Sequence, residues 1–189
     1  VGSEMCIRDS YFSGQTEVLA KSCGVSNVGM LFTAKSPITG WRFNTLLATT
    51  HIALCEVPKK LTKKLIHSKL NLFKDFCSSY TSKPFFKVAG INPHAGENGI
   101  LGNEEKDWLE DALITWNEKN RDIKLLGPLS PDSCWNSSAI AWRNQNAEKH
   151  DGILAMYHDQ GLIPMKVIAL NYSVNTTIGL PFIRTSPDH

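Results

Sequence analysis

The sequence predicts an α/β fold in which a mostly parallel sheet carries helices on both faces. Short apolar runs typical of buried strands alternate along the chain with longer segments whose apolar residues recur at helical spacing. Such alternation is typical of β-α units, whose strands run parallel because a helix joins each strand to the next. The chain has 189 residues, 42% of them hydrophobic and 20% charged, which suits one sizeable domain or one domain with part of another.

The N-terminal elements are expected to be one helix and two strands. Gly14–Lys21 begins a short helix, with Thr16 as its candidate N-cap because a threonine hydroxyl can accept a bond from the first turn. Val28–Ala34 is a compact apolar run between a glycine and a proline, which predicts a buried strand. Trp41–Thr50 is the next strand, and it ends in His51.

The middle of the chain predicts a long amphipathic helix followed by a third strand. Pro58 opens the helix, since proline at the first helical position lacks an N–H that would have no partner there. Apolar residues recur at helical spacing up to Cys77, while four lysines face outward (Lys59, Lys60, Lys63 and Lys64). These lysines form either a solvated helix face or an anion-binding patch. Phe85–Ile91 is the third strand.

A glycine-rich loop, Gly96–Gly102, separates the third strand from the next helix. Its glycines could let backbone N–H groups approach a phosphate, although a tight connection requires glycine equally well. Asn103 caps the helix that runs through Trp116. Ser130–Asp132 then forms a turn that leads into another short helix.

The remaining elements continue the alternation of strands and helices. Ile153–Met156 is a short apolar run bounded by polar residues, and it predicts a strand. Gly161–Leu170 is expected to be helical at least in part, and Ser173–Ile178 is the last predicted strand. No internal repeat or low-complexity segment interrupts this order.

Three histidines follow predicted strands at strand-to-loop corners. They are His51, His94 within the phrase Asn92–Glu97, and His158 within the phrase Tyr157–Gly161. Ligands of open α/β sheets bind beyond the carboxyl ends of the strands, so all three rings are expected at one edge. Three imidazoles suit zinc or another borderline divalent ion with open coordination positions. A histidine taken alone is more often a hydrogen-bonded structural residue than a ligand, and it is the shared placement of these three that favours a metal site.

A second group of polar residues surrounds the last apolar segments. Lys166, Asn175 and Arg184 supply an ammonium, an amide and a guanidinium, which together make a receptor for phosphate or carboxylate. Gly179–Pro181 breaks the chain before Arg184 and should bring the arginine to the sheet edge. The alternative is an ordinary surface ion pair.

Composition excludes several classes of partner and compartment. A formal net charge of +2 gives no reason to expect nucleic acid or an anionic membrane as a partner, and no apolar stretch is long enough to cross a bilayer. The cysteines are odd in number and scattered without a C-x-x-C pair, which argues against a zinc ribbon or a disulfide framework (Cys6, Cys23, Cys55, Cys77 and Cys134). The pattern fits the reducing cytoplasm.

Both ends of the chain are expected to be unnatural. Val1–Ser10 has no periodicity and contains an internal methionine, so we expect a non-native leader at residues 1–10. The chain stops at Ser186–His189 directly after an apolar run, without a closing helix. We therefore expect residues 11–189 to be a fragment of a longer protein.

Five phrases occur in order along the chain and together carry a family resemblance. They are Thr49–His51, Gly90–Glu97, Gly127–Leu129, Ala155–Gly161 and Gly179–Ser186. They resemble the 4-hydroxythreonine-4-phosphate dehydrogenase family of vitamin B6 biosynthesis, and the resemblance covers nearly everything from Gly14 onward. It implies a fold like that of the isocitrate and isopropylmalate dehydrogenases, with two α/β lobes and a homodimer. The chain would contain one lobe largely complete and part of the second.

The resemblance also implies roles for particular residues. A divalent metal (zinc, magnesium or cobalt) would be held by histidines, with the set completed across the dimer interface (His51, His94 and His158). A small phosphorylated amino acid would be bound by polar residues from both ends of the chain (Gln15, Thr16, Lys166, Asn175 and Arg184). Asp132 matches an acidic residue of the site, and Lys166 would either assist proton transfer or neutralise the substrate.

The implied reaction is an NAD- or NADP-linked oxidation of 4-phosphohydroxy-L-threonine, followed by decarboxylation. One position departs from the family pattern, because Gln15 stands where the family commonly has histidine, and glutamine cannot carry charge. A related dehydrogenase for another phosphorylated hydroxy acid therefore remains an alternative. So do a metal-dependent hydrolase, since three imidazoles can also activate water, and an inactive fragment.

Overall fold

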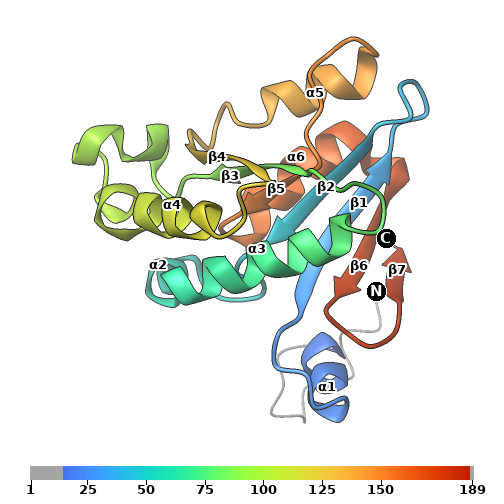
Figure 1. Ribbon diagram of the computed structural model, residues 1–189, viewed down its shortest axis with the longest axis horizontal. Helices are drawn as coiled ribbons and strands as arrows, with labels where there is room; N and C mark the ends of the chain where they lie inside the picture. Colours follow the sequence, from blue (N-terminus) through green and yellow to red (C-terminus); the bar gives the residue numbers. More distant parts are fainter. Residues whose placement is uncertain (1–14, 188–189) are drawn as a thin grey trace.

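A seven-stranded sheet forms the centre of the computed structural model, which describes residues 15–187 (Figure 1). Its strands are β1 (Gly29–Lys35), β2 (Arg42–Leu47), β3 (Phe85–Ala89), β4 (Lys124–Leu129), β5 (Gly152–Ala155), β6 (Ser173–Ile178) and β7 (Arg184–Pro187). They lie side by side in the order β4-β3-β5-β2-β1-β6-β7. The expected leader, Val1–Ser10, lies outside the described residues.

The sheet is mixed, but most of its strands point the same way. β4, β3, β5 and β2 pair in parallel in that order. β1 is antiparallel to both β2 and β6, and β7 is antiparallel to β6. Strands β2 to β6 therefore share one direction, and β1 and β7 oppose it. The predicted α/β class with a mostly parallel sheet is confirmed.

The sequence predicts the central strands but misses two strands, β4 and β7. β4 contains Gly127-Pro128, a pair that usually marks a turn. Proline is tolerated there because β4 lies at the edge of the sheet, where a missing N–H breaks no ladder of bonds. β7 forms the opposite edge, and its short polar sequence (Arg184–Pro187) lacks the apolar alternation that signals a strand.

Helices cover both faces of the sheet (Figure 1). They are α1 (Gln15–Ser22), α2 (Val57–Lys60), α3 (Lys63–Cys77), α4 (Glu110–Glu118), α5 (Asn136–Arg143) and α6 (His158–Ala169). A wider π turn, η4 (Glu105–Leu109), leads into α4, and two short 3₁₀ turns are η2 (Leu54–Glu56) and η5 (Leu170–Tyr172). Within residues 15–187 the helices are all too short or too polar to cross a membrane.

Successive strand residues point alternately into two cores, one under each helix layer. Leu46 packs with residues of α3 and α4, whereas Leu47 packs with residues of α5 and α6. In the first core the rings of Phe73 and Phe86 stack with centroids 4.7 Å apart. A Cβ atom at Gly152 would lie 1.9 Å from the ring of Phe73, so glycine lets α3 approach β5 closely.

Two N-terminal helix boundaries differ from the sequence-based expectation. The single helix expected from Pro58 is two helices, because Thr62 is extended and caps α3 by accepting a backbone bond from Leu65 at 3.2 Å. That cap starts a new helix after the four residues of α2. Thr16 lies within the first turn of α1 rather than at its N-cap.

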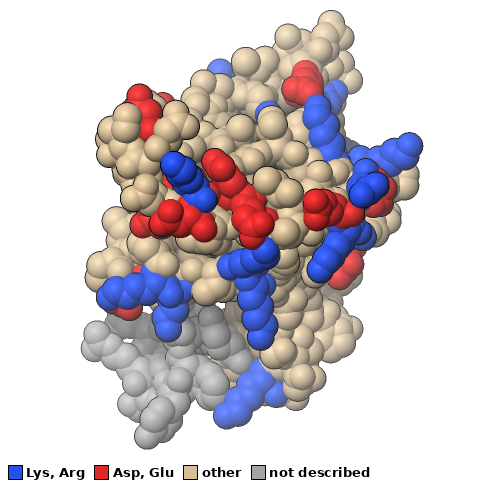
Figure 2. Space-filling view, turned by 60° about the vertical axis from the view of Figure 1, so that its left-hand side comes forward, with Lys and Arg blue, Asp and Glu red and all other residues tan. Residues whose placement is uncertain are grey.

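The lysine-rich region at α2 and α3 behaves as a solvated helix face. Lys59 pairs with Glu56 at 2.7 Å, and Lys63 pairs with Asp111 at 2.6 Å. Basic and acidic side chains are interspersed over the face of the molecule that Figure 2 shows. These pairings favour the solvated-face interpretation of the lysines over an anion-binding patch.

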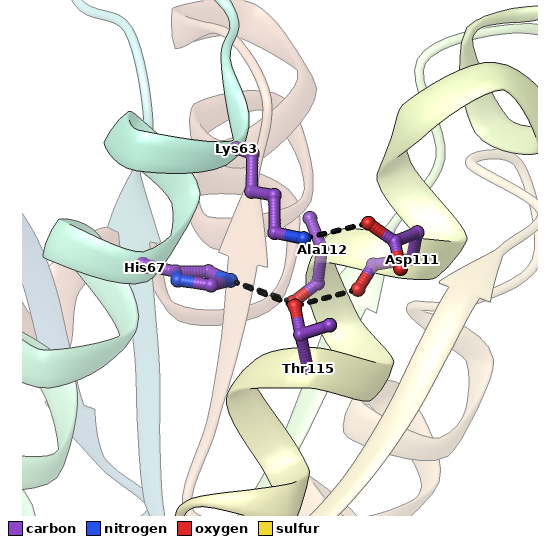
Figure 3. A network of polar contacts seen from close by, with 5 residues as sticks. All are labelled: Lys63, His67, Asp111, Ala112 and Thr115. Atoms are coloured by element: carbon purple, nitrogen blue, oxygen red, sulfur yellow. Dashed lines mark hydrogen bonds and ion pairs between the residues drawn. The ribbon is translucent and has the colours of Figure 1, made fainter.

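A polar network joins α3 to α4, the two helices that cover the core containing Leu46 (Figure 3). The Nε2 atom of His67 lies 2.8 Å from the carbonyl oxygen of Ala112 and 3.5 Å from the hydroxyl of Thr115. The hydroxyl of Thr115 donates to the carbonyl oxygen of Asp111 at 2.7 Å. His67 therefore has a structural role, which agrees with its omission from the predicted metal site.

Candidate functional site

Four neighbouring parallel strands end at one edge of the sheet, and a predicted site residue follows each of them. Asp132 follows β4, His94 follows β3, His158 follows β5 and His51 follows β2, in the spatial order of the strands. Helices and loops begin at this edge, so side chains there can converge on a ligand without breaking the sheet. The edge is therefore the candidate functional site.

His51 and His158 come together although they are far apart in the sequence. Their ring centroids are 5.3 Å apart, and the rings are tilted by 45°. They line a hollow of about 290 Å³ together with residues of the loop after β2 and of the start of α6 (Thr50, Ile52, Leu54, Val57, Tyr157 and Asp159). Adjacent strands β2 and β5 cause this meeting, because their ends deliver both rings to the same place.

His158 is the first residue of α6, whereas the sequence predicts that this helix starts at Gly161. A glycine usually marks a helix end, but a Cβ atom at Gly161 would lie 2.5 Å from Leu47 of β2. Glycine is needed there so that α6 can pack closely on the sheet.

The Nδ1 atom of His158 lies 2.7 Å from a carboxylate oxygen of Asp159. An Nδ1–H donated to Asp159 leaves Nε2 with a lone pair for a ligand.

His94 is not brought to the other two histidines within this chain. It lines a separate hollow with the glycine-rich loop and η4. Among the residues that the structure describes, no three side chains of histidine, cysteine, aspartate or glutamate lie close enough to hold one metal ion. Within the described residues the rings of His51 and His158 therefore lie together, and His94 follows a different strand end of the same sheet edge.

The backbone around His94 adopts an unusual left-handed turn, η3 (Pro93–Gly99). Six consecutive residues, 94–99, have positive φ, including His94 at 51° and Asn98 at 57°. Left-handed backbone costs about 1–2 kcal/mol for each residue that is not glycine, so neighbouring groups must hold it. Glu105 is 2% exposed and accepts bonds from the backbone N–H groups of Ile91 and Asn92 at 2.6 and 2.8 Å. It fixes the base of the turn.

Asp132 lies exposed in the turn between β4 and α5, as its sequence predicts. The hydroxyl of Ser130 donates a hydrogen bond to its carboxylate and lowers the pKa of Asp132 below its usual value. Its own backbone N–H group and the charge of His94 act in the same direction. Asp132 is thus held ionised on the side of the site where His94 lies.

The two ends of the chain meet at Arg184. Its Nη1 atom donates to the hydroxyl of Thr16 at 3.2 Å and to the hydroxyl of Thr177 at 2.9 Å. Thr16 comes from α1 and Arg184 from β7, 168 positions later in the sequence. These are two of the residues that the family resemblance implies for substrate binding, and Thr177 is a partner that the sequence does not reveal.

Asn175 shares a sheet face with Arg184, and α6 covers that face. Asn175 pairs with Phe32 of β1 in register, and Phe32 belongs to the core under α5 and α6. The Oδ1 atom of Asn175 is buried, and no group in residues 15–187 donates a hydrogen bond to it. Lys166 is half-buried on α6. The side chain of Gln15 lies outside the described part of the chain.

Two buried polar residues at the strand ends escape the sequence-based prediction. Glu105 and Gln160 are 2% and 7% exposed, and both accept hydrogen bonds from backbone beside the histidines. Gln160 lies within the phrase Tyr157–Gly161, so its place in a phrase of the family resemblance could have marked it as a candidate. Nothing in the sequence marks Glu105, because buried carboxylates cannot be told from exposed ones by spacing.

His150, which the sequence places in a polar loop, is buried beside β5. Its Nε2 atom lies 2.9 Å from the hydroxyl of Ser138, and its exposed fraction is 2%. Burial lowers the pKa of His150 to about 3, and the nearby charge of Lys87 acts in the same direction. His150 is therefore a neutral structural histidine and lies apart from the candidate site.

The fold defines a class: an α/β protein of the isocitrate and isopropylmalate dehydrogenase type, with a candidate site at the carboxyl edge of its sheet. The family described as pyridoxal phosphate biosynthetic protein PdxA matches residues 3–189. The chain belongs to this family.

Individual relatives agree with this assignment. The chain is 52% identical over 181 residues to a 4-hydroxythreonine-4-phosphate dehydrogenase from Synechococcus sp. (strain RCC307), covering 95% of the chain and 55% of that relative. The crystal structure of the enzyme of that name from Klebsiella pneumoniae aligns over 98% of the chain and 52% of its own, with a TM-score of 0.78 and 31% identity. The structure of a terephthalate 1,2-cis-dihydrodiol dehydrogenase from Burkholderia xenovorans LB400 aligns over 96% and 53%, with a TM-score of 0.70 and 26% identity. The chain thus spans about half the length of the relatives it matches.

Proposed function

We propose that this chain forms part of a dehydrogenase of vitamin B6 biosynthesis that oxidises 4-phosphohydroxy-L-threonine with NAD or NADP. The product would be 2-amino-3-oxo-4-phosphooxybutyrate, which loses carbon dioxide to give 3-amino-2-oxopropyl phosphate. The observation that carries the proposal is the pairing of His51 with His158 at the sheet edge, in a chain whose relatives bear the name of this enzyme. The free thiols among the described cysteines suit the cytoplasm, the expected compartment.

A divalent metal would be held by His51 and His158, with His94 as the third ligand. The donor chemistry suits such an ion, because two neighbouring imidazoles are available and Asp159 can orient the ring of His158. Imidazole nitrogens favour zinc or cobalt over magnesium. When bound, the ion would acidify the substrate hydroxyl and stabilise negative charge on its oxygen. Since His94 lies apart in one chain, we propose that a homodimer completes the set.

The substrate's anionic groups would bind at the β6–β7 end of the sheet, away from β3 and β4. Arg184 offers a guanidinium already oriented by Thr16 and Thr177, and guanidinium groups bind phosphate and carboxylate through paired bonds. The buried Oδ1 atom of Asn175 would accept a bond from a substrate N–H or O–H group, which would satisfy it. Lys166 and Gln15 would complete this receptor.

Proton transfer would fall to Lys166 or Asp132. Oxidation removes a hydride from the substrate carbon to the nicotinamide and a proton from its hydroxyl. The carboxylate of Asp132 would accept that proton once the metal has acidified the hydroxyl, because its lowered pKa makes it a weak base by itself. Lys166 would protonate the carbon that loses carbon dioxide, or it would neutralise the substrate carboxylate.

The proposal is tested by following nicotinamide absorbance with 4-phosphohydroxy-L-threonine, the full-length protein and added zinc or cobalt. Wild type should reduce NAD or NADP, and His51→Ala should lose turnover by about 100-fold or more. His67→Asn, which changes a histidine outside the site, should retain it. Release of phosphate or another hydrolysis product without nicotinamide reduction would instead support the metal-dependent hydrolase.

A related substrate is the second candidate. Gln15 replaces the usual family histidine, and a dihydrodiol dehydrogenase is among the solved structures with this fold. Turnover of another hydroxy acid or diol with higher kcat/KM than 4-phosphohydroxy-L-threonine would favour this alternative. A Gln15→His variant that shifts the preference back would assign the change to that residue.

A further inference from the structure

We propose that Gln160 is a positioning residue that holds the His94 and His158 segments in fixed relation at the strand ends. The inference rests on the proposed metal-binding function. In this role Gln160 acts on the proposed metal-binding histidines through hydrogen bonds to the backbone, and it does not bind the metal or the substrate itself.

The side-chain amide of Gln160 bridges two neighbouring strands. Its Oε1 atom accepts a bond from the backbone N–H of Met156 at 2.6 Å, and its Nε2 atom donates to the carbonyl oxygen of Gly90 at 2.8 Å. Met156 follows β5 and Gly90 follows β3. The ladder between these strands ends at Val88 and Leu154, so the amide continues the pairing where the backbones no longer pair.

The bridge is one link in a line of hydrogen bonds across all four strand ends. Gly90 follows β3, and Leu129 is the last residue of β4. The N–H of Gly90 donates to the carbonyl oxygen of Leu129 at 2.7 Å. The hydroxyl of Thr49, beyond β2, donates to the carbonyl oxygen of Met156 at 2.7 Å. The four backbone positions in this line, one at each strand end, stand two to four residues before a candidate site residue. In the order of the strands they are Leu129 before Asp132, Gly90 before His94, Met156 before His158 and Thr49 before His51.

The surroundings leave little freedom on the His94 side of the bridge. A Cβ atom at Gly90 would lie 3.1 Å from both the Glu105 carboxylate and the Cα atom of Ala95. Glu105 in turn holds the N–H groups of Ile91 and Asn92. A displacement of Gly90 would therefore be passed to the left-handed turn that carries His94.

Glutamine is chemically suited to this bridge because it both donates and accepts. Gln160 occupies the third position of α6, where a glutamine or glutamate can reach back and cap the helix start. Glutamate would keep the bond from Met156 and place a favourable charge at the helix N-terminus, but it could not donate to Gly90. The substitution Gln160→Glu therefore separates helix capping from bridging.

The test is a cobalt(II) titration of the full-length protein, followed by the visible absorption of the bound ion. Gln160→Glu should bind cobalt about 10-fold or more weakly than wild type and should show a changed visible spectrum. Its unfolding midpoint without metal should fall, because a carboxylate in this buried position would face the carbonyl oxygen of Gly90, so folding of the variant is checked separately by circular dichroism. Gln145→Glu, the same substitution at an exposed position after α5, should match wild type in all three measurements.

Cobalt affinity of Gln160→Glu within about twofold of wild type would overturn the inference, as would an equal loss in Gln145→Glu. If Gln160→Glu does not fold, Gln160→Asn replaces it, because asparagine keeps the amide but is too short to span both partners. Unchanged affinity in Gln160→Asn would overturn the inference equally.

His94→Ala distinguishes the proposed metal site from the proposed bridge. If wild type binds cobalt and His94→Ala binds it as tightly, the metal site itself is wrong. If His94→Ala loses affinity and Gln160→Glu does not, the bridge alone is wrong.

Discussion

Individual side chains at the sheet edge have environments that suit different tasks. His158 has a carboxylate partner and an open ring nitrogen, whereas His150 is buried against Ser138 and neutral. Arg184 is already oriented by two hydroxyl groups. Residue type alone does not separate these cases, because burial and partners decide whether an imidazole can serve as a ligand.

Removing the carboxylate beside His158 should weaken metal binding. In Asp159→Asn the amide can still face Nδ1, but it no longer favours the tautomer that leaves Nε2 free, so zinc affinity should fall by about 10-fold. A zinc titration monitored by calorimetry measures this. Glu148→Gln, an exposed carboxylate paired with Lys124, is the control, and an equal loss in both variants would contradict a role for Asp159.

The buried histidine should make stability depend on pH. The pKa of His150 is lowered to about 3 in the folded protein, so its contribution is fully present above the unfolded pKa near 6.5 and is lost as pH falls below it. Between pH 7 and pH 5 the free energy of unfolding of wild type should fall by about 2 kcal/mol more than that of His150→Gln. Urea unfolding at the two pH values measures the difference, and identical pH dependence would contradict the assignment.

At the scale of elements, local pattern predicts what is regular and misses what tertiary contacts impose. The apolar runs predict the central strands, because a strand that is covered on both faces needs a nearly continuous apolar sequence. They do not predict β4, because Gly127-Pro128 looks like a turn until a neighbouring strand pairs with it. They do not predict the left-handed turn at Pro93–Gly99 either, since Glu105 holds its base and lies several residues further on.

The contact between α3 and the sheet should dominate the stability of the first core. Phe73 is fully buried and stacks on Phe86 at 4.7 Å, and Gly152 leaves no space into which the neighbours could relax. Phe73→Ala should lower the free energy of unfolding by about 3–5 kcal/mol through lost burial and a cavity. Chemical denaturation measures it. Ile163→Ala, at a position 63% exposed, should change stability little, and a comparable loss there would contradict this account.

The candidate site shows how far sequence reasoning extends. Placement of the histidines after strands puts them at one sheet edge, because parallel strands end together. The pairing of His51 with His158 rather than His94 depends on strand order, which the sequence does not state. The contact of Thr16 with Arg184 joins opposite ends of the chain, and only the folded arrangement reveals it.

At the scale of the whole molecule, the chain provides a sheet with two covered faces and a site open along one edge. It spans about half the length of the relatives it matches. The separation of His94 from the histidine pair is consistent with a set completed by a second copy, as proposed. A closed two-fold assembly would form two equivalent sites.

Mixing two inactive variants tests that assembly. His51→Ala and His94→Ala, in the full-length protein, should each be inactive as homodimers. In mixed dimers one site would receive all three histidines, so co-refolding equal amounts should restore about a quarter of wild-type turnover. No recovery, despite mixed dimers detected by mass spectrometry, would mean that each chain builds its site alone or that the metal is not shared.

Metal binding by His51 and His158 is tested by a crystal structure of the full-length protein with zinc, located by its anomalous scattering. One ion should lie about 2.0–2.1 Å from a nitrogen of both His51 and His158. An ion bound elsewhere, with these two rings free of metal, would contradict metal binding by this pair.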